Sequence, residues 1–185
     1  KGIQVRGAGD NGLYIDGSHN VIENCSFYNN RDSGLQLGRG DSSQASIESW
    51  PSYNLIKNCT SYDNFDDETY GENADGFAAK LTIGYGNVFD GCISFRNSDD
   101  GWDLYAKSDS GCIGTVILYN CVSFENGMLS YAIPDPATGK PTYNTLNGDG
   151  IGFKLGGSTM EGDVIMYNCQ SFDNKLHGIG DNSNP

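Results

Sequence analysis

The feature that most constrains this chain is a repeat centred on cysteine. Alignment on Cys25, Cys59, Cys92, Cys121 and Cys169 gives five segments with an aromatic residue three positions later and an asparagine five positions later. The cysteines are 34, 33, 29 and 48 residues apart, which is the period of a solenoid with one enlarged coil. The repeat therefore predicts a stack of coils.

A second element recurs between these segments, in which a polar residue and a glycine precede a hydrophobic residue. Its six copies are Asn11-Gly-Leu, Ser33-Gly-Leu, Asp75-Gly-Phe, Asp100-Gly-Trp, Asp149-Gly-Ile and His177-Gly-Ile. Each coil thus offers at least two short strands, and coils stacked about 4.8 Å apart place like residues above like. The sequence predicts an all-β parallel β-helix with ladders of cysteine, aromatic and asparagine side chains.

The cysteines are interpreted as small buried hydrophobic residues rather than as a disulfide framework, because they occupy one column of the repeat. Cys112 lies outside that column. The leucine-rich horseshoe is the main alternative solenoid, but its leucine frame is missing and no helical segment closes the repeats.

Composition excludes several classes of partner. The chain has 24 acidic residues against 11 lysines and arginines, a net charge of -13, so its field repels nucleic acid and anionic membrane surfaces. Nor does any apolar run approach the length that spans a bilayer.

We expect residues 1–185 to form one domain with an enlarged coil at about 127–147. Because the chain starts without Met and both ends lie close to a repeat, we interpret it as an internal piece of a longer protein.

Alternation along the strands assigns side chains to faces. The positions predicted to face outward are Ala78, Lys80, Asp103, Tyr105, Gly152 and Lys154. In this alignment Lys80 and Lys154 share one register on either side of Asp103, on a long, shallow face that suits a polymer. By this reasoning alone, either lysine could act as a base, or both could be solvated surface residues.

Aspartates gather beside this face. Asp75, Asp100 and Asp149 share the position before the repeat glycine, Asp99 adjoins Asp100, and Asp103 projects from the following strand. Close carboxylates repel by about 4 kcal/mol per pair at an effective dielectric near 20. Calcium removes that conflict and accepts six to eight oxygen ligands, whereas magnesium demands a stricter octahedron. Asp75, Asp99, Asp100 and Asp103 are therefore predicted calcium ligands; the alternatives are aspartates that only cap turns, or a calcium ion that only braces the coils.

Three segments carry a resemblance to a known family: Glu72-Asn-Ala-Asp-Gly-Phe-Ala-Ala-Lys-Leu81, Asn97-Ser-Asp-Asp-Gly-Trp-Asp-Leu-Tyr105 and Asp149-Gly-Ile-Gly-Phe-Lys-Leu-Gly-Gly157. Together they resemble the family 9 polysaccharide lyases, pectate lyases built on a right-handed β-helix. The resemblance implies that Asp75, Asp99, Asp100 and Asp103 hold calcium and that Lys154 is the catalytic base. It leaves Lys80 and Tyr105 as candidate substrate contacts.

The expected function is calcium-dependent β-elimination of an acidic plant cell-wall polysaccharide, with polygalacturonate the first candidate and rhamnogalacturonan the second. The resemblance also implies a protein that is secreted, periplasmic or on the cell surface, and we expect a monomer. Two other classes remain open: a non-catalytic β-helix that binds polysaccharide or serves as a stalk, and a glycoside hydrolase that uses paired aspartates. The long coil at 127–147 is expected to affect substrate preference.

Overall fold

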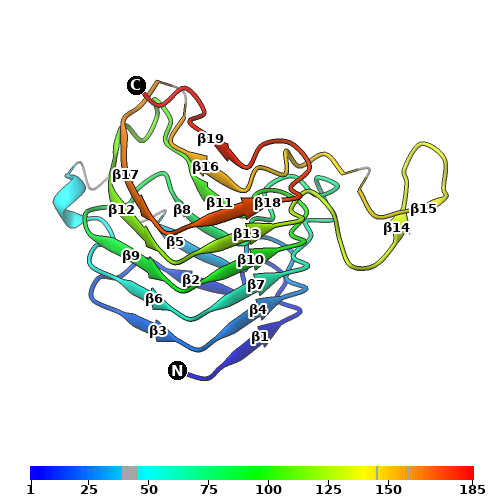
Figure 1. The fold of residues 1–185 in the computed structure, drawn as a ribbon, viewed down its shortest axis with the longest axis horizontal. Coiled ribbons are helices and arrows are strands. Elements are labelled where there is room, and N and C mark those ends of the chain that lie inside the picture. Colours follow the sequence, from blue (N-terminus) through cyan, green and yellow to red (C-terminus); the bar gives the residue numbers. More distant parts are fainter. Residues whose placement is uncertain (39–45, 145, 158) are drawn as a thin grey trace.

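Successive coils of the chain each contribute a short strand to each of three parallel sheets among the described residues (Figure 1). The computed structural model describes residues 1–38, 46–144, 146–157 and 159–185. The predicted parallel β-helix is confirmed. No helix in the described part of the chain is long and apolar enough to cross a membrane.

We name the sheets A, B and C, and their strands follow in stacking order. Sheet A contains β1 (Gln4–Arg6), β4 (Ser26–Tyr28), β7 (Thr60–Tyr62), β10 (Ile93–Phe95), β13 (Val122–Phe124) and β18 (Gln170–Phe172). Sheet B contains β2 (Leu13–Ile15), β5 (Leu35–Gly38), β8 (Phe77–Lys80), β11 (Trp102–Leu104), β16 (Phe153–Leu155) and β19 (Ile179–Gly180). Sheet C contains β3 (Val21–Glu23), β6 (Leu55–Lys57), β9 (Asn87–Asp90), β12 (Ile113–Tyr119) and β17 (Gly162–Tyr167).

The segment between β13 and β16 leaves the stack, and we call residues 127–147 the arm (Figure 1). It holds the antiparallel pair β14 (Ile133–Pro134) and β15 (Pro141–Thr142), and residue 145 lies outside the described ranges. Another short element, the 3-10 helix η1 (Ile47–Ser49), lies between β5 and β6. The Lys175 ammonium donates to the carbonyls of Leu146 and Gly148, at 2.8 and 2.7 Å, so the returning end of the arm is attached to the coil that follows.

The predicted ladders are present. The aromatic column of the repeat stacks face to face, with centroids 4.9–5.0 Å apart from Tyr28 through Tyr62, Phe95 and Phe124 to Phe172. The column cysteines are free thiols, and all but Cys169 are buried, so their interpretation as hydrophobic core residues is confirmed.

Buried asparagines hold neighbouring coils in register. The Asn64 amide donates to Asn97 Oδ1 at 2.7 Å, and the Asn97 amide donates to Asn126 Oδ1 at 3.0 Å. The Asn97 amide also donates to Ser94 Oγ at 2.9 Å, and that hydroxyl lies where a Cβ on Gly76 would be only 1.9 Å away. The repeat glycine is therefore required by the close approach of a serine from sheet A.

One part of the predicted register is wrong. The serine contact and the backbone pairing identify Gly152, not Gly150, as the repeat glycine: Gly101 N–H donates to the Ile151 carbonyl, and Trp102 pairs with Phe153. Ile151 therefore occupies the column of Asp75 and Asp100, and Asp149 precedes it by two residues.

The same two-residue shift places Lys80 and Lys154 at different register positions, although the sequence predicted one position for both. Lys154 pairs with Asp103, and Asp103 pairs with Ala78, so Lys80 lies two residues further along its strand. The outer face is also less open than expected here, because Lys80 and Asp103 are only 6% and 5% exposed.

Replacement of Asn97 by alanine tests the ladder. We expect Asn97→Ala to lower the free energy of unfolding by about 2–4 kcal/mol, because the buried amide partners on Asn64 and Asn126 lose their hydrogen bonds. Urea denaturation measures the change. Asn144→Ala removes an exposed asparagine of the arm and should stay within about 0.5 kcal/mol of wild type. Equal effects of the two changes would contradict the ladder's role.

Candidate functional site

The predicted site residues come from three neighbouring strands of sheet B. Asp75 precedes β8 and Lys80 ends it, Asp99 and Asp100 precede β11, Asp103 lies within β11, and Lys154 lies within β16. A cavity of about 590 Å³ opens over these strands. Its lining includes Lys80, Asp99, Asp103, Tyr105 and Lys154.

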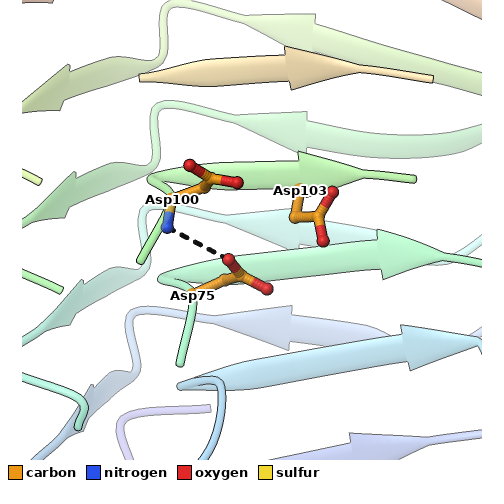
Figure 2. Close-up of side chains that lie close together, drawn as sticks. All are labelled: Asp75, Asp100 and Asp103. Carbon is orange, nitrogen blue, oxygen red and sulfur yellow. Dashed lines mark hydrogen bonds between the residues drawn. The ribbon is translucent and has the colours of Figure 1, made fainter. Parts of the chain in front are cut away.

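Three carboxylates converge at the edge of this cavity (Figure 2). Asp75, Asp100 and Asp103 each offer one oxygen, and these oxygens lie within 4.8 Å of one another. The first two side chains are fully buried and Asp103 is nearly so. Asp75 Oδ1 accepts a hydrogen bond from the Asp100 backbone N–H at 3.1 Å, which fixes the Asp75 carboxylate against the next coil.

Asp99 belongs to a second, overlapping group. Asp99, Asp100 and Asp149 also offer oxygens within 4.8 Å of one another. The two Asp99 oxygens accept the backbone N–H groups of Asn73 at 2.9 Å and Asp149 at 2.7 Å. Three of the four predicted ligands thus converge, and Asp99 lies in a neighbouring group that shares Asp100. Asp99 also joins two loops that border the cavity.

Two lysines face these carboxylates from opposite coils. Lys80 Nζ lies 2.7 Å from Asp75 Oδ2 and 2.8 Å from Asp103 Oδ2. Lys154 Nζ lies 3.0 Å from Asp100 Oδ2 and 3.5 Å from Asp149 Oδ2, and its side chain is 15% exposed. Its ammonium also lies 6.0 Å from the centre of the Tyr105 ring. Lys154 is therefore the less tightly paired of the two.

Burial and mutual repulsion shape the electrostatics. Loss of solvation raises the pKa of Asp75 and of Asp100 well above the usual carboxylate range, and neighbouring aspartates add to the effect. Burial lowers the pKa of Lys80 and of Lys154, but the surrounding carboxylates outweigh it and raise the pKa of both amines. Both lysines are therefore protonated as long as no other cation balances the negative charge of the carboxylates.

The donor set fits a divalent cation. Asp103 Oδ1 and Asp100 Oδ2 are buried and have no hydrogen-bond partner, although the latter forms an ion pair with Lys154. Buried oxygens of this kind are uncommon and call for an explanation such as a bound ion. Asp75, Asp99, Asp100 and Asp103 outnumber the two ammonium groups that face them, and an all-oxygen donor set suits calcium.

Some residues of the cavity were not anticipated from the sequence. They are Glu72, Asn73, Leu81, Lys107, Asn147, Asn182 and Ser183. Asp149, which the sequence analysis grouped with Asp75 and Asp100, completes the lining. Asn73 has a left-handed backbone with φ 77°, so an asparagine two residues before Asp75 was the available signal for a tight loop there. Nothing in the sequence pattern indicated Asn147, because its position depends on how the arm returns to the stack of coils.

Comparison with known proteins places these residues in a family context. The family model described as "Pel9A-like, right handed beta helix region" matches residues 1–185. A protein of Paenibacillus polymyxa (strain SC2) named "Pectate lyase L" is 52% identical over 185 residues, all of this chain and 38% of that protein. A "Pectate disaccharide-lyase" of Dickeya chrysanthemi is 33% identical over 185 residues, 21% of its length.

A solved structure agrees with the fold. The structure titled "Crystal structure of pectate lyase Pel9A" superposes with a TM-score of 0.82 and 36% sequence identity, over all of this chain and 40% of that one. The chain thus spans about two fifths or less of the length of these relatives. Sequence repeat, sheet topology and these comparisons agree, and the chain belongs to the Pel9A-like right-handed β-helix family.

Proposed function

We propose that this chain carries the catalytic coils of a calcium-dependent pectate lyase that cleaves its polymer by β-elimination. The observation that carries the proposal is the backbone pairing of Lys154 with Asp103, which places an amine beside a cluster of buried carboxylates in which Asp103 Oδ1 has no hydrogen-bond partner. The names of the relatives support the substrate class, since "Pectate lyase L" and "Pectate disaccharide-lyase" both refer to pectate.

The predicted ligands are Asp75, Asp99, Asp100 and Asp103. Calcium bound to them would attract the uronate carboxylate of the substrate and stabilise the charge that develops beside it at C5. Burial of the aspartates beside the cavity holds their oxygens in place before any cation arrives.

Lys154 is the proposed base. Its amine removes the proton from C5, the C5 electron pair forms a double bond to C4, and the bond from C4 to the glycosidic oxygen breaks. The leaving oxygen takes up a proton and the other product carries an unsaturated uronide. The carboxylates that raise the pKa of Lys154 keep it protonated, so the amine becomes a base only once their charge is balanced.

The proposal also covers the preferred polysaccharide and the place where the protein acts. Polygalacturonate is the first candidate and rhamnogalacturonan the second, and Tyr105 and Lys80 line the cavity where a sugar ring would contact them. A plant cell-wall polymer lies outside the bacterial or fungal cell that degrades it. We therefore propose a protein that acts in the periplasm, at the cell surface or after secretion.

Replacement of Lys154 tests the base. We expect Lys154→Met to lower kcat by about a thousandfold, because the stem is kept and only the proton acceptor is lost. The ultraviolet absorbance of the unsaturated uronide measures turnover on polygalacturonate and on rhamnogalacturonan. Lys140→Met, an exposed position on the arm, is the control. Near-wild-type turnover by Lys154→Met would refute the assignment, and cleavage without unsaturated product would indicate hydrolysis.

Replacement of Asp103 tests the calcium ligands. Asp103→Asn should raise the calcium concentration needed for half-maximal activity about tenfold or more, since a charged ligand becomes a neutral one. Titration of calcium in a chelator-buffered assay measures it. Asp109→Asn changes an exposed aspartate in the loop after β11 and should leave the calcium requirement unchanged. An unaltered requirement in Asp103→Asn would favour a calcium ion that only braces the coils.

The pH dependence of calcium binding follows from the raised pKa of Asp75 and of Asp100. Protons compete with the cation wherever these carboxyls are protonated, so calcium affinity should fall as the pH is lowered, and the fall should begin above the ordinary carboxylate range. Calorimetric titration of the protein with calcium at several pH values measures this. Constant affinity down to the ordinary aspartate range, near about pH 4, would contradict the expectation.

A further inference from the structure

Lys80 is a buried lysine that bridges carboxylates of two neighbouring coils. Its ammonium contacts Asp75 Oδ2 at 2.7 Å and Asp103 Oδ2 at 2.8 Å, and its side chain is 8% exposed. Both aspartates belong to the group of three whose oxygens converge within 4.8 Å. The ammonium therefore engages one oxygen from each of two carboxylates that a divalent cation would also need.

The backbone around Lys80 holds it in this place. The next residue, Leu81, has a left-handed backbone with φ 69°, an unfavourable conformation for leucine. Its N–H donates to the Tyr105 carbonyl at 2.7 Å. On the other side Lys80 pairs with Gly38, where a Cβ would lie 2.7 Å from the Lys80 carbonyl. Such strain persists only where surrounding contacts fix it, so the position of Lys80 is set by the fold.

Lys80 and Lys154 differ in ways that separate their roles. Lys154 pairs with Asp100 at 3.0 Å and with the half-exposed Asp149 at 3.5 Å, so one of its two ion pairs is weak and lies toward solvent. Both ion pairs of Lys80 are short, and both partners are buried. A buried ammonium with two such partners is poorly placed to accept a proton from a substrate.

We propose that Lys80 is a positioning residue that acts as the internal cation of the site. It holds the Asp75 and Asp103 carboxylates together when no metal ion is bound, and it weakens the binding of the divalent cation that shares them. This role rests on the proposed calcium site. If the ammonium stays, it repels the entering cation, and if it moves away, two buried ion pairs are lost. Both routes reduce calcium affinity, so Lys80 tunes the site toward weaker, reversible binding.

Calorimetric calcium titration and thermal unfolding of the full-length protein test this role. Lys80→Met keeps the stem and removes the charge, so we expect about tenfold tighter calcium binding, together with a lower melting temperature in chelator. Lys80→Gln can still donate to one carboxylate and should show the same tightening with a smaller loss of stability. Lys107→Met is the matched control, because this lysine lines the same cavity but is 43% exposed and pairs with Asp109 instead. Its effect on calcium affinity should be less than about twofold.

The outcomes separate this inference from the function on which it rests. Unchanged or weaker calcium binding in both Lys80 variants, or equal tightening in Lys107→Met, overturns the role of Lys80. If a Lys80 variant can be purified only in excess calcium, its calcium affinity is measured by titration with a chelator. Unfolding of the variant at a lower free calcium concentration than the wild type supports the role of Lys80. A wild-type protein that forms unsaturated product without any calcium overturns the calcium site and this role together. Calcium-dependent wild-type cleavage without tighter binding in the Lys80 variants overturns the role alone.

Discussion

In-register hydrogen bonding between successive coils is the constraint on which the rest of this molecule depends. No coil can bury its own apolar face, so each is stable only against its neighbours. Residues far apart in sequence meet through this stacking: the Asp100 carboxylate accepts the Ile151 N–H across 51 positions, and the Asp75 carboxylate accepts the Asp100 N–H across 25. A slip by one residue would exchange the two faces of sheet B and turn Trp102 outward and Asp103 inward. The asparagine ladder and the contacts between glycine and serine therefore fix the geometry of the cavity as well as the core.

The site holds charged side chains in the buried interior of the coils, where other groups must balance their charge. Asp75 and Asp100 are fully buried, and the nearest positive groups are Lys80 and Lys154. These two ammonium groups neutralise only part of the acidic cluster, which leaves Asp103 Oδ1 without a partner. In water such carboxylates would separate, but the strands of sheet B hold them together. The backbone thus maintains a repulsive arrangement that a bound divalent cation would relieve, and this links the stability of these coils to the proposed chemistry.

Much of this could be predicted from the sequence, because a repeated column of residues predicts spatial neighbours directly. The cysteine, aromatic and asparagine columns could be predicted from the spacing of these residues in the sequence alone. The register of the coil that contains Lys154 was wrong because Asp149-Gly-Ile fits the motif of a polar residue, a glycine and a hydrophobic residue. The motif thus points to Gly150, whereas the repeat glycine is Gly152, which follows the apolar Ile151. The large residue after the glycine would have resolved the choice, since Phe153 continues the stack of Phe77 and Trp102. Asp149 and Asn147 at the cavity edge depend on the path of the arm, which has no counterpart in the other coils.

We propose that stacked coils bring Asp75, Asp100 and Asp103 into one cation site beside Lys154. A crystal structure of the full-length protein grown with calcium, with the anomalous signal recorded, tests this most directly. We expect a calcium peak about 2.3–2.6 Å from oxygens of these three aspartates, beside the cavity that Lys154 lines. An ordered site without such a peak at saturating calcium, or calcium bound only elsewhere on the coils, would contradict it.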